Sequence, residues 1–222
     1  MEIKKCIFDQ RPSAVVFEGA MVSVNFDIEE STQVVNPAGE GQEEESRTVY
    51  LAHVIRLAHP LTEERLQEAV LEAGFDGYKA EEVAADTLLQ LVQGGELNGD
   101  ALALAKKVVI ARISQYDVSD NVNNFTLNGA PMWLGREMRR TLRDRFNDEK
   151  DEGEETTNLV YGDAVISLPI DTAIAMIKQL ERYSRHCYDQ TALHKAAVDA
   201  LETVEAVLAY DFTEGYEANP EF

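Results

Sequence analysis

The chain has 222 residues, 45% of them hydrophobic, and carries a net charge of −21. This length predicts one or two domains, and this hydrophobic content excludes a wholly disordered chain. The 41 acidic side chains disfavour binding to phosphate backbones, and no run approaches the roughly 18 apolar residues of a membrane span, so we expect no nucleic acid and no membrane as partners.

Residues 1–60 are expected to form a β-rich segment. From Val22 to Ile28, apolar and polar residues alternate without exception, which is the period of a strand with one buried face. Residues 29–47 hold six glutamates and few apolar side chains, so like-charge repulsion predicts a flexible acidic loop there. A further strand is expected over 48–57, which completes an antiparallel meander.

Residues 61–116 are expected to be a helical segment. Thr62 is well placed to cap the first helix, because two glutamates then fall in the first turn, where the helix dipole favours acids. Two more helices are predicted over 80–92 and 100–114. The polar stretch 117–124 then marks a linker and the best domain boundary.

Residues 122–222 are expected to form a C-terminal α+β module. Asn128-Gly129 is the strongest two-residue signal for a β-hairpin. The other expected elements are a helix over 135–149 with Leu134, Met138, Leu142 and Phe146 on its apolar side, a hairpin over 157–168, and a long helix capped by Asp171 that keeps Cys187 and Tyr188 on its apolar face. The fold class predicted for the chain is α+β: a small antiparallel meander, a helical middle segment, and hairpins packed on two main helices.

No set of residues predicts a reaction. His186 and Cys187 are adjacent on a helix, where side chains point about 100° apart, so they do not form a nucleophile pair. We expect Cys187, like Cys6, to be a buried and reduced thiol. His186 and His194 are separated by about 12 Å of helix rise, too far for one metal ion. The sequence therefore predicts no catalytic residues, no cofactor and no metal site.

The one basic island of this acidic sequence lies in the helix over 135–149. Two interpretations stay open: an anchor for an acidic partner or polyanion, or a solvated face that the following acids neutralise. Two interpretations also stay open for the aromatic residues of 122–222: they bind a sugar, or they pack in the hydrophobic core. The candidate partner-contact residues are Arg136, Arg139, Arg140, Arg143, Trp133 and Tyr216.

Four short motifs follow one another in a distinctive order. They are Phe125-Thr126-Leu127-Asn128-Gly129, Met132-Trp133-Leu134, Leu168-Pro169-Ile170-Asp171, and Tyr210-Asp211-Phe212 followed by Gly215-Tyr216. Together they resemble a C-terminal domain of unknown function found in phage and prophage proteins, some of them tail-associated. No catalytic residues are established for that family. The Arg-rich stretch after Leu134 departs from the family pattern, in which a less basic helix is expected.

The resemblance implies a non-enzymatic structural or assembly protein of a phage or prophage tail that acts through protein–protein contacts. The implied partners are other tail or fibre proteins, or a second copy of the chain. The implied location is the bacterial cytoplasm during assembly, with the virion tail as a later one; two distant cysteines and the lack of a signal-peptide apolar stretch agree with a cytosolic setting. Two alternatives stay open: a chaperone-like adaptor that holds a fibre tip, and a carbohydrate-active enzyme with two facing carboxylates.

Overall fold

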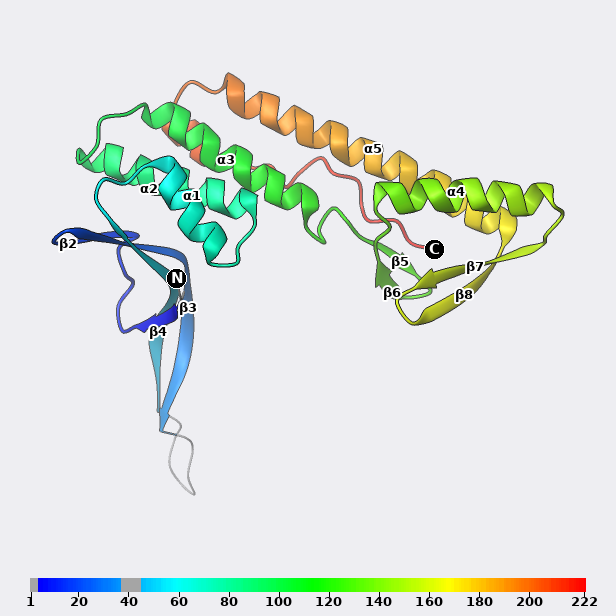
Figure 1. Ribbon diagram of the computed structural model, residues 1–222, viewed down its shortest axis with the longest axis horizontal. Helices are drawn as coiled ribbons and strands as arrows, with labels where there is room; N and C mark the ends of the chain where they lie inside the picture. Colours follow the sequence, from blue (N-terminus) through cyan, green and yellow to red (C-terminus); the bar gives the residue numbers. More distant parts are fainter. Residues whose placement is uncertain (1–3, 37–44) are drawn as a thin grey trace. The chain divides into compact units, whose positions relative to one another are not determined.

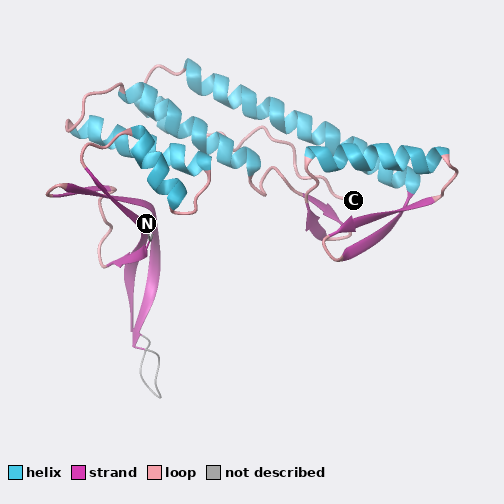
Figure 2. Ribbon diagram, viewed as in Figure 1, coloured by secondary structure: helices cyan, strands magenta, loops and turns pink. Residues whose placement is uncertain are grey.

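The computed structural model describes residues 4–36 and 45–222. Helices and antiparallel sheets occur together, which confirms the α+β prediction (Figure 2). The chain divides into two compact units. Unit 1 comprises the residues up to Arg112 together with Val198–Tyr210, and unit 2 comprises Ile113–Ala197 together with Asp211–Phe222.

Unit 1 contains a four-stranded antiparallel sheet in the order β1-β4-β3-β2 (Figure 1). The strands are β1 (Lys4–Phe8), β2 (Val15–Glu18), β3 (Met21–Asn36) and β4 (Glu45–Ala58). Strands β3 and β4 pair from Met21 opposite Ala58 to Asn36 opposite Glu45. The predicted acidic loop over 29–47 is therefore wrong at both of its ends, which are strand, and its middle, 37–44, lies outside the described residues.

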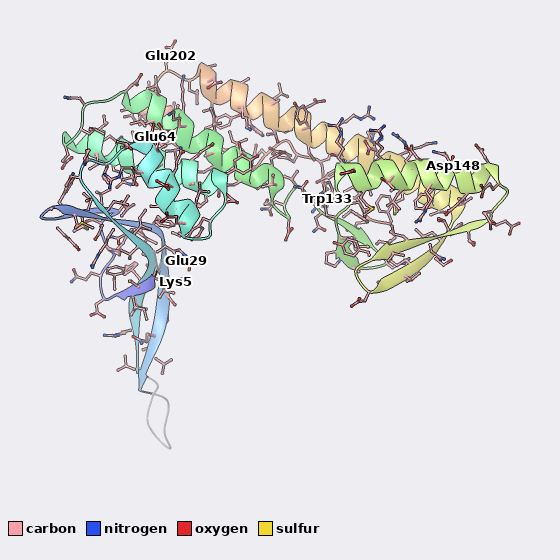
Figure 3. The ribbon with its side chains drawn as sticks, viewed as in Figure 1. Lys5, Glu29, Glu64, Trp133, Asp148 and Glu202 are labelled. Atoms are coloured by element: carbon pink, nitrogen blue, oxygen red, sulfur yellow. The ribbon has the colours of Figure 1, made fainter. Side chains whose placement is uncertain are left out.

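Side chains from two other strands bond to this acidic stretch of β3. The Lys5 ammonium of β1 lies 3.2 Å from the Glu29 carboxylate of β3, and Figure 3 labels both residues. Arg47 of β4 donates to the Gln33 side chain of β3 at 2.8 Å. The Lys5 contact offsets part of the local repulsion, and the bond from Arg47 to the neutral Gln33 joins β4 to β3.

Three helices and the sheet share the core of unit 1. The helices of this unit are α1 (Glu63–Glu72), α2 (Gly77–Gly94), α3 (Ala101–Val118), which enters unit 2 at Ile113, and the short α6 (Val204–Leu208). Thr62 caps α1, as predicted, by accepting from the Arg65 amide. The apolar side of β3, with Val22 and Val24, packs against α1 and α2 in one hydrophobic cluster, so strands and helices hold each other in place.

The polar side of β3 is buried as well, contrary to the expected half-buried strand. Ser23 is 3% exposed and Asn25 is 4% exposed. The Asn25 side chain donates to the Ser13 carbonyl at 2.6 Å, and its backbone amide donates to the Ala14 carbonyl at 2.7 Å. The segment before β2 therefore covers this face and satisfies its polar groups.

Unit 2 is built from two hairpins and two main helices. Its elements are β5 (Phe125–Leu127), β6 (Ala130–Met132), α4 (Arg136–Asp151), β7 (Thr156–Tyr161), β8 (Ala164–Pro169) and α5 (Ile170–Ala200), whose last three residues belong to unit 1. Asn128 and Gly129 both have positive φ, 52° and 81°, which confirms the predicted two-residue turn. Because α5 begins at Ile170, Asp171 lies in its first turn and is not the cap.

The core of unit 2 lies between the hairpins and the helices. Phe125, Phe146 and Ile177 are fully buried in one cluster. The C-terminal tail is bound along β5: the Thr126 amide donates to the Pro220 carbonyl at 2.9 Å, and the Phe222 amide returns to the Thr126 carbonyl at 2.8 Å. The aromatic tail is thus part of this packed unit.

Two expected core positions of the helices are wrong. Met138 of α4 is 51% exposed, and Tyr188 of α5 is 70% exposed. In α4 the buried residues are Arg139, Leu142 and Phe146. A repeat of four residues drifts by about 40° per step around a helix, so Met138 falls off the face that Leu142 and Phe146 define.

Candidate functional site

The arginines of α4 divide into one buried side chain and a set at the surface. Arg139 lies on the buried face with Leu142, whereas Arg136, Arg140 and Arg143 recur at the spacing i, i+4, i+7 on the neighbouring face. Arg136 and Arg140 are exposed and Arg143 is half-buried. The predicted basic island is therefore real, but its members differ in role.

Arg139 is a structural residue. Its side chain is 4% exposed and donates to the Glu181 carboxylate of α5 at 3.2 Å, to the Ser184 hydroxyl at 2.9 Å and to the Leu134 carbonyl at 2.5 Å. Its guanidinium carbon also lies 5.2 Å from the centre of the Trp133 ring, within cation–π range. Arg139 thus joins α4 to α5, and because it is buried it is not open to a partner, whereas Trp133 is only partly buried.

Three of the four remaining arginines of α4 line a surface hollow, whereas the fourth, Arg145, is paired with Glu149 at 3.3 Å. Arg136, Arg140, Arg143 and Glu181 surround a volume of about 330 Å³. Glu181 is already paired with Arg139, and Arg143 is paired with Asp144 at 3.1 Å. Arg136 and Arg140 have no ion pair with any residue in the described ranges. The hollow is therefore positively charged, because its one acidic residue, Glu181, is paired with Arg139.

Helix α5 repeats the same basic spacing. Lys178, Arg182 and Arg185 stand at i, i+4 and i+7, and all three are exposed. They flank Glu181, the residue that α5 contributes to the hollow, and Arg185 donates to the Glu181 carbonyl at 3.3 Å. We call these cations of the two helices the basic surface: Arg136, Arg140, Arg143, Lys178, Arg182 and Arg185. Figure 3 shows nitrogen-tipped side chains along α5 beside α4.

Tyr216 does not join this surface. Its ring stacks on His194 with the ring centres 5.5 Å apart, and its hydroxyl lies 2.9 Å from the Thr191 hydroxyl. Burial raises the pKa of Tyr216. The residue anchors the C-terminal tail on α5. Among the six expected contact residues, the structure brings Arg136, Arg140 and Arg143 together at the surface hollow, pairs Arg139 with Trp133, and leaves Tyr216 apart from both groups.

Unit 2 presents no reactive thiol. Cys187 is buried, and burial raises the pKa of its thiol, so the nucleophilic thiolate is disfavoured. Cys6 is half-buried, not buried as expected.

Within residues 4–36 and 45–222, no three His, Cys, Asp or Glu side chains are grouped so that they could hold a metal ion. No helix in the same ranges is long and apolar enough to cross a membrane.

A second site, which the sequence did not predict, lies in unit 1. A cavity of about 340 Å³ opens between the loop before β2, strand β3, helix α2 and the unit-1 end of α3. We call it the unit-1 cavity, and its polar lining consists of Arg11, Asn25, Asp27, Lys79, Glu82, Asp86, Thr87, Gln90 and Arg112. The side chain of Lys79, 18% exposed, lies 2.5 Å from the Asp27 carboxylate and 3.0 Å from that of Glu82. Arg112 pairs with the other oxygen of Glu82 at 2.8 Å.

Two features of the cavity are energetically unfavourable by themselves. Asp27 has a φ of 51°, a left-handed conformation that costs an ordinary residue roughly 1 kcal/mol, and it lies at a β-bulge between Phe26 and Glu29. Burial raises the pKa of Asp86, whose Oδ2 accepts from the Gln90 side chain at 2.7 Å. Strain and a desolvated carboxylate at one place are typical of functional sites.

The sequence holds a signal that could have revealed this cavity. Lys79, Glu82, Asp86 and Gln90 follow each other at steps of three and four, which places a polar stripe on one side of a helix that is otherwise largely buried. Charged residues on a buried helix must have partners. The partners, from β3 and α3, are remote in sequence, so the stripe alone does not identify them.

Comparison with known proteins adds no relative: no protein-family model, no curated protein and no solved structure matches this chain. The resemblance to the phage and prophage domain therefore stays a prediction.

Proposed function

We propose that this chain is a non-enzymatic structural or assembly protein that acts through protein–protein contacts, and that the basic surface binds an acidic segment of the partner. The observation that carries the proposal is that Arg136, Arg140 and Arg143 line one hollow in a chain whose net charge is −21. Helix α5, which the Arg139–Glu181 pair joins to α4, carries three more exposed cations. Guanidinium groups form bidentate pairs with carboxylates. Arg136 and Arg140 are available for such pairs because they have none with a described residue.

The setting that we propose is a phage or prophage tail, and its support is the motif order of residues 122–222. The partners in that setting are other tail or fibre proteins, or a second copy of this chain, met in the bacterial cytoplasm during assembly. Mass spectrometry of purified virions tests the setting. A structural part remains in the particle, whereas a chaperone-like adaptor leaves it.

The contact itself is tested with a fluorescently labelled octaglutamate peptide and the full chain, by anisotropy at low and moderate salt. We expect binding that weakens with salt and that falls several-fold in Arg136→Gln/Arg140→Gln, because each lost guanidinium removes a charge-assisted pair. Lys150→Gln/Lys195→Gln is the control, since it likewise removes two charges from the same unit, outside the basic surface. Equal binding of the peptide by the unchanged chain, the double variant and the control would refute the proposal. If an eight-nucleotide DNA strand binds more tightly than the peptide, the partner of the basic surface is a nucleic acid and not an acidic protein.

A further inference from the structure

We propose that the unit-1 cavity binds a small zwitterion of the α-amino acid class, with the Arg11 guanidinium holding the ligand carboxylate and the Asp86 carboxylate holding the ligand ammonium group. The inference concerns a site in unit 1 that shares no residue with the basic surface, and it does not depend on the proposed function.

The ion pairs inside the cavity leave two groups of opposite charge. Lys79 is engaged with Asp27 and Glu82, and Arg112 is engaged with Glu82. Arg11 has no ion pair with a described residue. Asp86 accepts from the Gln90 amide through one carboxylate oxygen, and no described group bonds to the other. A ligand that satisfies both remaining groups must carry one anionic and one cationic end.

The walls of the cavity are held in place before any ligand arrives. The loop that carries Arg11 is fixed by Asn25, whose side chain is buried and donates to the Ser13 carbonyl at 2.6 Å. On the opposite wall, Lys79 ties the bulge at Asp27 to helix α2. Preorganised walls reduce the ordering cost of binding, which is what affinity for a small ligand requires.

The size of the cavity selects among zwitterions. A volume of about 340 Å³ lies at the lower end of ligand pockets, which span about 300–1,000 Å³. A free amino acid is within this limit, whereas an extended peptide or a dinucleotide is too large. The apolar part of the lining, Val24, Phe26 and Val83, offers contact to a hydrophobic side chain.

The test uses the full chain and the twenty common L-amino acids, screened by thermal shift and confirmed by calorimetry. At least one amino acid should raise the melting temperature. Its analogue without the amino group should bind about thirtyfold more weakly, because it loses the partly buried charge pair with Asp86. Its analogue without the carboxyl group should bind about threefold more weakly, because Arg11 is exposed and its pair with the ligand is weakened by water. In Arg11→Gln, the amino acid and its analogue without the carboxyl group should bind equally well. In Asp86→Asn, the amino acid and its analogue without the amino group should bind equally well.

Two charge-matched controls separate binding from folding. Glu81→Gln removes an exposed carboxylate from the same helix, and Arg56→Gln removes an exposed guanidinium from strand β4, outside both the cavity and the basic surface; both should bind the amino acid as the unchanged chain does. The proposal is overturned if no amino acid shifts the melting temperature at 10 mM, roughly the weakest affinity worth detecting. It is also overturned if the folded Arg11 and Asp86 variants bind like the controls.

Discussion

Replacing Arg139 by alanine is expected to destabilise unit 2, although the residue belongs to a helix rich in surface arginines. Its side chain is 4% exposed and makes hydrogen bonds to Glu181, Ser184 and the Leu134 carbonyl. Removing one partner of a buried charge pair costs about 3–5 kcal/mol. Because the Glu181 side chain is 29% exposed and water can reach it, we expect about 3 kcal/mol, the lower end of that range.

The assay is urea unfolding followed by the fluorescence of Trp133. It is the chain's single tryptophan and lies 5.2 Å from the Arg139 guanidinium carbon, so the signal reports on unit 2. Arg140→Ala is the matched control, since exposed arginines without an ion pair change stability by only about 0.5 kcal/mol or less. Equal midpoints for the two variants would refute the structural role assigned to Arg139.

Three further outcomes follow from single residues. Gly129→Ala should cost about 1 kcal/mol by urea unfolding, because φ is 81° there; an unchanged midpoint would contradict the turn assignment. Iodoacetamide should label Cys6 before Cys187 in the folded chain, as mass spectrometry would show, because burial raises the pKa of the Cys187 thiol; the reverse order would count against this packing. Burial also raises the pKa of Asp86 above its unfolded value, so ionisation costs stability at neutral pH and protonation removes that cost. Asp86→Asn should therefore raise the melting temperature at pH 7, with a gain that shrinks towards pH 3.8, and a gain independent of pH would contradict it.

Features with a short-range cause could be predicted from the sequence. The turn at Asn128-Gly129 and the cap at Thr62 depend on residues within three positions, and both are present. The lengths of β3 and β4 could not be predicted in this way. The acidic part of β3 is strand because β4, which is distant in sequence, pairs with it, and the side chains of Lys5 in β1 and Arg47 in β4 bond to Glu29 and Gln33.

Hydrophobic periodicity does not predict which polar residues are buried. Arg139 is buried because Glu181, forty-two positions later, reaches its guanidinium, and no local period encodes that partner. Asn25 alternates as a solvent-facing residue should, yet the loop before β2 covers it. In both cases the hydrogen-bond partner, not the hydrophobic pattern, decides which side of the element is inside.

Salt offers a way to distinguish the two proposed sites with one ligand. Glutamate has a carboxylate for the basic surface and a zwitterionic end for the unit-1 cavity. Exposed pairs are strongly screened by salt, whereas partly buried pairs are screened much less. Arg136, Arg140 and the cavity's Arg11 are exposed, while Asp86 is half-buried, so salt weakens the Asp86 contact least. Glutamate binding that disappears at moderate salt and is lost in Arg136→Gln/Arg140→Gln therefore belongs to the basic surface. Binding that persists in part and is lost in Asp86→Asn belongs to the cavity.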